Sequence, residues 1–245
     1  DIFLKSLSHA YGVIEKKTAL PILSNILIEA KEQKIKITAT DLDLIYSEEI
    51  PLENLKSEGA TTTSANILYD ILRKLEPNSQ VEFSLQNTNK LKVVSGNSKF
   101  NLLCISSSNF PISEEDIPQK TFEISSQKIL KLLNKTKISI SNDETRHYLN
   151  GIYLHKNEIE DKIYLTGVAT DSHRLSSSSV EIDSKTEFES IILPKKTIYQ
   201  LITLLEEDNG VIKISNNKSK IKFEMNSGVL ISKVIDGRFP DYSKV

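Results

Sequence analysis

Apolar and polar positions alternate in two rhythms along the chain, one typical of helices and one typical of strands. Apolar residues at helical spacing between Phe3 and Ile14 predict a first helix. The stretches 23–28 and 34–41 alternate apolar and polar residues, which is typical of half-buried strands. A second helix is predicted over 64–75, with Ser64 as its N-cap. Its apolar stripe consists of Ile67, Leu68, Ile71, Leu72 and Leu75.

The second half of the chain repeats the order of the first. The first half continues with predicted strands over 81–85, 90–93 and 100–105. The second half is predicted to contain a helix over 128–134, strands over 149–154 and 162–169, and a helix over 194–205. Such self-similarity is the sequence signature of a duplicated structural unit.

Two pairs of short motifs fix the spacing of this repeat. Phe110 in Asn-Phe-Pro and Phe239 in Arg-Phe-Pro stand 129 residues apart, and the Thr-Asp pairs ending at Asp41 and Asp171 stand 130 apart. We therefore predict an α+β fold of two duplicated domains, 1–117 and 118–245, each with two helices on one face of antiparallel sheets. The acidic, proline-bounded stretch 114–118 is expected to be an exposed connector.

Composition favours an ordinary globular protein of a reducing compartment. The chain has 245 residues and 38% hydrophobic residues, enough for one large or two medium cores. Its single cysteine, Cys104, cannot form an internal disulfide, and its apolar neighbours predict a buried strand residue. No apolar run approaches the roughly 18 residues that span a bilayer, and no signal pattern is present, so we expect a cytoplasmic protein without membrane contact.

Basic side chains gather on the predicted helices although the net charge is only −2. Lys5, His9 and Lys16 fall on nearly one face of the first helix. Lys128, Lys131 and Lys135 form a stripe on the third helix, and the fourth opens with Lys195 and Lys196. Such stripes would attract phosphates without reading sequence. Ordinary solvation of lysine is the alternative explanation.

The sequence offers little support for catalysis, metal or nucleotide binding. The segment Asp171-Ser172-His173-Arg174 contains the letters of a hydrolytic triad, but neighbouring side chains of an extended segment point to opposite faces. The four histidines lack paired ligand spacing. No glycine-rich phosphate loop is present, so no cofactor or metal is expected.

Four segments together resemble the beta subunit of bacterial DNA polymerase III, the sliding clamp family. They are 20–25, 146–151, 169–175 and 236–242, which read LPILSN, RHYLNG, ATDSHRL and DGRFPDY. The resemblance implies a non-catalytic processivity factor with three similar domains per subunit, and a head-to-tail homodimer ring that slides on double-stranded DNA. It also implies that this chain covers the first two domains, without the family's short opening strand and third domain.

The resemblance also implies which residues face DNA. Lys17, Tyr148 and Lys196 match DNA-facing positions, whereas His147 stands where the family often has tyrosine. The helix faces add Arg73, Lys128, Lys131 and Lys135 as candidates.

A second implied site is a groove that receives linear peptides from polymerase subunits, the clamp loader and repair proteins. The matching positions are Leu149, Thr170, Ser172, His173, Arg174, Leu175, Pro240, Lys244 and Val245. Lys244 replaces a residue that is often arginine, and Ser172 one that is often glycine. Ordinary core packing is the alternative role for the apolar members.

Two rival functions stay open on the sequence alone. One is a hydrolase that uses Asp171 and His173, and the other is an unrelated duplicated protein-interaction module.

Overall fold

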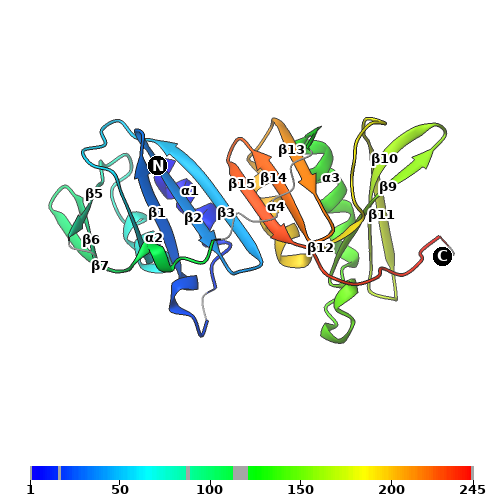
Figure 1. Ribbon diagram of the computed structural model, residues 1–245, viewed down its shortest axis with the longest axis horizontal. Coiled ribbons are helices and arrows are strands. Elements are labelled where there is room, and N and C mark those ends of the chain that lie inside the picture. The colour runs from blue at the N-terminus through cyan, green and yellow to red at the C-terminus, as the bar shows by residue number, and fades with distance from the viewer. Residues whose placement is uncertain (1, 16–17, 87–88, 113–120, 244–245) are drawn as a thin grey trace. The chain divides into compact units, whose positions relative to one another are not determined.

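The chain divides into two compact units, residues 1–113 and 114–245, which are described separately (Figure 1). The computed structural model describes residues 2–15, 18–86, 89–112 and 121–243. The predicted domain boundary at 117/118 and the predicted acidic connector lie outside the described residues.

Unit 1 is a twisted antiparallel sheet with two helices. Its elements are α1 (Ile2–Tyr11), a 3₁₀ turn (Pro21–Ser24), β1 (Asn25–Lys31), β2 (Lys34–Thr40), β3 (Leu44–Pro51), β4 (Gly59–Ser64), α2 (Ala65–Leu72), β5 (Glu82–Gln86), β6 (Lys90–Ser95), β7 (Ser98–Ile105) and a 3₁₀ turn (Ser107–Asn109). The strands follow the order β5-β6-β7-β4-β1-β2-β3. Strand β2 shows the predicted alternation only in its first half, where Ile35 and Ile37 are buried beside the more exposed lysines; in its second half Thr38 and Thr40 are buried as well as Ala39.

The second helix is shorter than predicted. Ser64 is its N-cap, and the hydroxyl of Ser64 accepts a hydrogen bond from the backbone N–H of Ile67. The helix ends at Leu72. Just beyond it, the backbone N–H of Lys74 donates to the carbonyl of Ile71, three residues earlier, as in a 3₁₀ turn. Ile67 was wrongly assigned to the apolar stripe, because 53% of its surface is exposed.

His9 does not belong to a basic face of α1. Its side chain is only 3% exposed, and its Nδ1 lies 3.2 Å from Oε2 of Glu48. The hydroxyl of Tyr46 donates to the same carboxylate oxygen at 2.8 Å. Helical spacing alone could not reveal that this histidine points toward β3 instead of solvent. Lys16, the third predicted member of that face, lies outside the described residues.

The Glu48 carboxylate should make unit 1 sensitive to acid. Burial raises its pKa, but hydrogen bonds from His9 and Tyr46 outweigh burial and leave the pKa below the usual 4.5. Because the folded pKa is below the unfolded one, this stability is present above pH 4.5 and is lost as pH falls through the folded pKa. We expect Glu48→Gln to flatten the pH dependence of the free energy of unfolding below pH 4.5.

Urea titrations between pH 3 and pH 7, roughly spanning the ordinary carboxylate range, measure this effect. Glu158→Gln, at an exposed position on β9, is the matched control and should keep the wild-type pH dependence. Identical slopes for wild type and Glu48→Gln would contradict the assignment.

Unit 2 also packs two helices against antiparallel strands, which here form two separate sheets. Its elements are β8 (Phe122–Ser125), α3 (Ser126–Thr136), 3₁₀ turns (Lys137–Ser139 and Glu144–Leu149), β9 (Gly151–Ile159), β10 (Lys162–Thr170), β11 (Leu175–Glu181), β12 (Ile191–Pro194), α4 (Lys195–Glu206), β13 (Val211–Asn216), β14 (Lys220–Met225) and β15 (Gly228–Lys233). One sheet has the order β15-β14-β13-β8, and the other has the order β11-β10-β9-β12.

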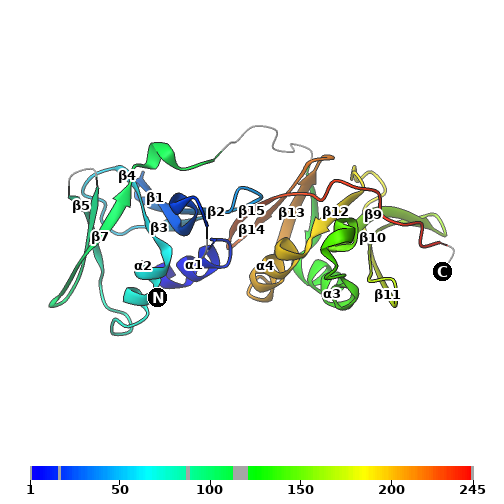
Figure 2. The ribbon, with the colours of Figure 1, turned by 90° about the horizontal axis from the view of Figure 1, so that it is seen from below.

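Apolar helix faces form the core of unit 2. On α3, Ile129, Leu132 and Leu133 are buried. The helix approaches β10 so closely that a Cβ at Gly167 would lie 2.6 Å from Cδ2 of Leu132, so a larger residue there would force the Leu132 side chain to shift. Within each unit the two helices run side by side against the strands (Figure 2). The predicted α+β class is therefore confirmed.

Two strand assignments need correction. The predicted strand 149–154 begins only at Gly151, because Leu149 closes the preceding 3₁₀ turn. On β7 the predicted buried run 102–105 is interrupted, since Leu103 is 77% exposed and Cys104 is half-buried. Successive side chains of a strand point to opposite faces of the sheet, so a continuous apolar run in the sequence does not show which of its side chains are buried.

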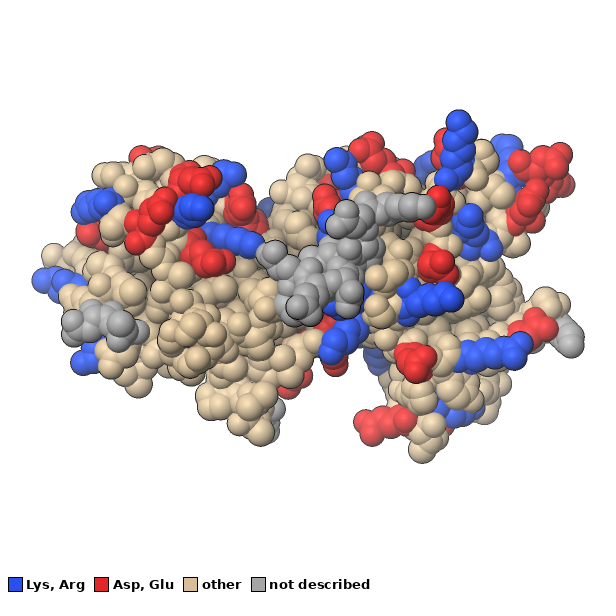
Figure 3. Space-filling model, in the orientation of Figure 1, with Lys and Arg blue, Asp and Glu red and all other residues tan. Residues whose placement is uncertain are grey.

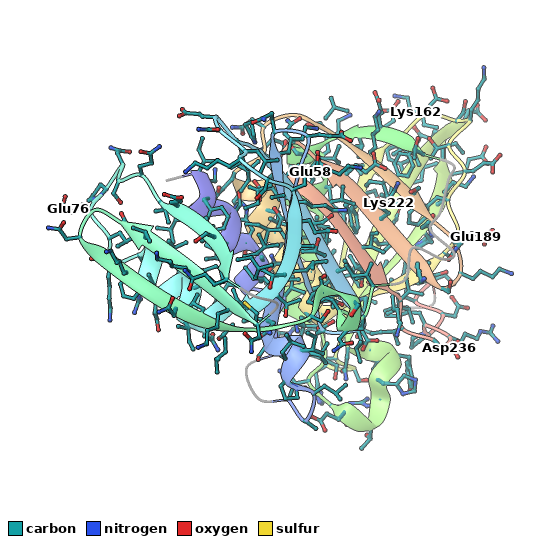
Figure 4. All side chains as sticks on the ribbon, turned by 60° about the vertical axis from the view of Figure 1, so that its left-hand side comes forward. Glu58, Glu76, Lys162, Glu189, Lys222 and Asp236 are labelled. Atoms are coloured by element: carbon teal, nitrogen blue, oxygen red, sulfur yellow. The ribbon has the colours of Figure 1, made fainter. Side chains whose placement is uncertain are left out.

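The two units differ beside one strand. In unit 2, β8 pairs along β13, where Ile124 lies opposite Ile212. The strand of unit 1 that corresponds to β13 is β5, because each is the first strand after the second helix of its unit. Among the described residues, β5 pairs only with β6. A groove of about 490 Å³ lies beside it, lined partly by Phe3, Phe83 and Glu76, the last labelled in Figure 4.

No helix in the described part of the chain is long and apolar enough to cross a membrane.

Candidate functional site

A hydrogen-bonded turn after Thr170 shapes the segment that carries most of the predicted peptide-binding residues. Oδ1 of Asp171 accepts hydrogen bonds from the backbone N–H groups of His173 and Arg174, both at 3.0 Å. These bonds, with that from His173 the strongest influence, hold the pKa of the Asp171 carboxyl below its usual range. Unit 1 contains the same turn, in which Asp41 accepts from the backbone of Asp43 at 3.0 Å and Leu44 at 2.7 Å.

This geometry argues against a hydrolytic triad. The segment is a turn and not the extended chain that we predicted, because Ser172 has a φ of 77°. Asp171 is engaged with the backbone that it caps and with the guanidinium of Arg174. The Ser172 hydroxyl accepts a hydrogen bond from Nη1 of Arg146 at 2.6 Å. Among the described residues, no hydrogen bond joins the side chains of Ser172 and His173.

Arg146 is a member of this site that residue types alone did not reveal. Its Nε lies 2.8 Å from Oδ2 of Asp143, and its Nη1 reaches Ser172. Asp143 also accepts hydrogen bonds from the hydroxyl and backbone of Thr145, which lower the pKa of the Asp143 carboxyl together with Arg146. Arg146 therefore joins the turn before β9 to the turn after β10.

Ser172 occupies a left-handed conformation that favours glycine. Relief of this conformation should make Ser172→Gly more stable by up to about 1 kcal/mol, despite loss of the exposed hydrogen bond to Arg146. Leu42, with a φ of 81° in the matching turn of unit 1, should respond in the same direction. Urea unfolding measures the change, and Ser177→Gly on strand β11 serves as the control that should lose stability. A loss of stability in Ser172→Gly would show that the turn carries no strain.

Two of the predicted apolar positions, Leu149 and Leu175, belong to one hydrophobic cluster. Its buried members are Leu149, Val168, Ile192 and Phe239, and its partly buried members are Tyr148, Tyr153, Leu175, Ile235 and Tyr242. Leu149 and Leu175, which stand far apart in sequence, are thus brought together.

Polar predicted residues lie at the edge of this cluster. The Thr170 hydroxyl donates to the backbone carbonyl of Arg174 at 2.7 Å and accepts from the backbone N–H of Ser172 at 3.1 Å. The side chains of His173 and Arg174 are exposed, as is Pro240 beside the buried Phe239. Lys244 and Val245 lie outside the described residues.

The predicted DNA-facing residues have different surroundings. Lys128, Lys131 and Lys135 are exposed on α3, opposite the buried face of that helix. Lys196 is exposed in the first turn of α4. Arg73 forms an ion pair with Asp70 at 3.1 Å, so part of its charge is compensated. Lys17 lies outside the described residues.

Tyr148 and His147 pack close to the segment that follows β15. A ring nitrogen of His147 lies 3.2 Å from the backbone oxygen of Asp236, the residue labelled in Figure 4. A Cβ at Gly237 would lie 3.1 Å from Cβ of Tyr148, so the backbone passes close to this tyrosine. Tyr148 is half-buried and also belongs to the hydrophobic cluster.

A further aromatic residue stands among cations on the helices of unit 2. Tyr199 is 46% exposed, and the ammonium groups of Lys137 and Lys195 each lie 6.0 Å from the centre of its ring. We did not single out Tyr199 from the sequence, because one tyrosine on a helix carries no pattern. Unlike the surroundings of Tyr199, where two lysines gather, the face seen in Figure 3 has positive and negative side chains interspersed.

Comparison with known proteins identifies the family. The family model for the N-terminal domain of the DNA polymerase III beta subunit matches residues 1–114. The family model for its central domain matches residues 123–241. The chain belongs to the DNA polymerase III beta subunit family. The recognition from sequence segments is confirmed.

Individual relatives of this family agree in sequence. The chain is 34% identical over 244 residues to the beta sliding clamp of Caulobacter vibrioides, covering 99% of this chain and 65% of that protein. It is 37% identical to the beta sliding clamp of Rickettsia felis, covering 98% of this chain and 63% of that protein. The chain thus spans somewhat less than two thirds of the length of these relatives.

Solved structures of the family agree in fold. A DnaN sliding clamp from Bartonella birtlesii, bound to griselimycin, has a TM-score of 0.95 and 40% identity, covering 99% of this chain and 65% of that one. The beta sliding clamp of C. crescentus also has a TM-score of 0.95, with 34% identity and coverage of 100% and 65%. The predicted fold of duplicated clamp domains is therefore confirmed.

Proposed function

We propose that this chain forms the DNA-facing and client-binding part of a sliding clamp, a non-catalytic processivity factor of the replicative DNA polymerase. The observation that supports this proposal best is the repeated unit of two adjacent helices on antiparallel strands, found in a chain of the beta subunit family. In the proposed whole protein, subunits close as a homodimer ring around double-stranded DNA in the cytoplasm. A topological link keeps such a ring on DNA without tight binding.

The helices supply the proposed contact with DNA. The lysine stripe of α3 faces away from its buried side, so the ammonium groups are available to phosphates. Lysines on a helix flank attract the backbone of the duplex without reading base edges, which suits sliding over any sequence. We assign the same role to Arg73, Tyr148 and Lys196, and to Lys17 outside the described residues.

The cluster around Leu149 supplies the proposed peptide site. The partly buried Leu175 offers apolar contact over the buried Leu149, while Thr170, Ser172 and the exposed His173 and Arg174 offer polar groups at its edge. A peptide-anchoring site typically combines apolar walls with a few directing polar groups. We propose that linear peptides of polymerase subunits, the clamp loader and repair proteins bind here, with Pro240, Lys244 and Val245 completing the site.

Retention on circular DNA tests the clamp proposal. The full-length subunit carrying these units is loaded by its clamp loader onto nicked circular DNA, and bound protein is measured after gel filtration. We expect retention on the circle and loss to background when a restriction enzyme linearises the DNA, because a ring slides off free ends. Equal retention on linear and circular DNA would indicate a conventional binding protein.

A further inference from the structure

An aromatic ladder of four side chains joins β9 to the segment after β15. It consists of Tyr153, His155, Phe239 and Tyr242. The rings of Tyr153 and Phe239 stack with centres 5.1 Å apart and planes 8° from parallel. The ring of His155 stacks on Tyr153, and the centres of these two rings lie 4.9 Å apart. Tyr153 and His155 are two positions apart on one strand, so they point to the same face.

Hydrogen bonds fix the orientation of the His155 ring. Its Nδ1 lies 2.8 Å from the backbone oxygen of Lys156. A carbonyl oxygen can only accept, so Nδ1 carries the hydrogen and Nε2 of the neutral ring is an acceptor. The hydroxyl of Tyr242 lies 2.6 Å from Nε2 and donates to it. His155 therefore bridges the β9 backbone and the Tyr242 side chain.

The ladder holds the C-terminal part of segment 236–243, and the contact between His147 and the backbone oxygen of Asp236 holds its start. The last backbone bridge before it joins Ile235 to Ile192, with the N–H of Ile235 donating to the Ile192 oxygen at 2.9 Å. Beyond that bridge, no described residue of the segment belongs to a strand. Phe239 is only 7% exposed, and Tyr242 is partly buried against the cluster that contains Leu149 and Leu175. Side-chain contacts are thus the main link of this segment to β9.

We propose that His155 is a positioning residue for peptide binding, because it holds Tyr242 against β9 beside the Tyr153–Phe239 stack and so fixes the wall at Pro240. This inference rests on the proposed peptide site. The ladder lies behind that wall and need not touch the peptide. Loosening it should let Pro240 move away from Leu149 and Leu175, which lowers affinity through lost preorganisation.

Tyr242→Phe and His155→Phe test the proposal with small changes. Each keeps an aromatic ring and removes the hydrogen bond between the two side chains. Tyr69→Phe, which removes a hydroxyl from the separate Tyr11–Tyr69 stack of unit 1, is the matched control. Hydrogen exchange measures how fast the backbone amides of 236–243 open. Calorimetry measures the affinity for a synthetic peptide copied from the tail of the cognate replicative polymerase. Thermal unfolding measures global stability.

We expect Tyr242→Phe and His155→Phe to speed exchange in 236–243 and to weaken the peptide about fivefold, the loss typical of one hydrogen bond. The thermal midpoint and the control should stay unchanged. Unchanged exchange, or faster exchange with unchanged peptide affinity, would overturn the positioning role. Leu175→Asp distinguishes a failure of the proposed peptide site from a failure of the ladder's positioning role. If that variant still binds the peptide, the proposed site itself is wrong, whereas if it loses the peptide, any failure concerns the ladder alone.

Discussion

Replacing Leu175 with aspartate is expected to reduce the affinity for a polymerase-tail peptide by at least about a hundredfold. Leu175 begins β11 opposite Thr170 and packs against the cluster that contains Leu149. Loss of apolar contact alone removes roughly 1.5–3 kcal/mol, which corresponds to about tenfold to hundredfold in affinity. An ionised carboxylate adds the cost of desolvation when a peptide covers it.

Isothermal titration calorimetry measures this change directly. Ser177→Asp is the matched control, because Ser177 is exposed on the same strand and the substitution adds the same charge. The control is expected to bind like wild type. Wild-type affinity in Leu175→Asp would assign Leu175 to ordinary core packing and show that the proposed peptide site is wrong.

Reversing the charge of the α3 lysines is expected to have the second large effect. The triple change of Lys128, Lys131 and Lys135 to Glu should lower DNA loading at least about tenfold at low salt. If each lysine neutralises one phosphate, the slope of log affinity against log salt concentration should fall by roughly 2.7, at about 0.9 for each contact.

The control for this experiment must match the change in net charge. Lys162, Lys185 and Lys213 are exposed on strands and a loop of unit 2 and lie on neither helix. Their triple change to Glu should weaken DNA loading far less, because only long-range and screened repulsion remains. Equal effects of the two triple variants would show that overall charge matters and that α3 has no special role.

Periodicity predicted the existence of the helices better than their ends or surroundings. The α3 pattern predicted a buried face, and Ile129, Leu132 and Leu133 are buried as that pattern requires. The same reasoning failed for His9, because a polar residue can face the core when a distant strand offers partners. Glu48 and Tyr46 are those partners, and nothing in the local pattern around His9 indicates them.

The candidate site was predictable where residues share a short motif and unpredictable where contacts span the chain. Asp171 and Arg174 lie in one motif, although its conformation was not foreseen, because an aspartate that caps its own turn looks the same in sequence as one on a strand. The contact between His155 and Tyr242 spans 87 residues. Only the fold brings such a pair together.

The doubled turn after Thr40 and Thr170 has a consequence for how this protein can change over time. In both copies the threonine hydroxyl and the following aspartate hold the backbone through equivalent hydrogen bonds. The next residue is Leu42 in one copy and Ser172 in the other, each in the left-handed region. Because the turn keeps its hydrogen bonds with either side chain at the third position, that position can change without a change in the turn, and in unit 2 such a change would alter the edge of the proposed peptide site.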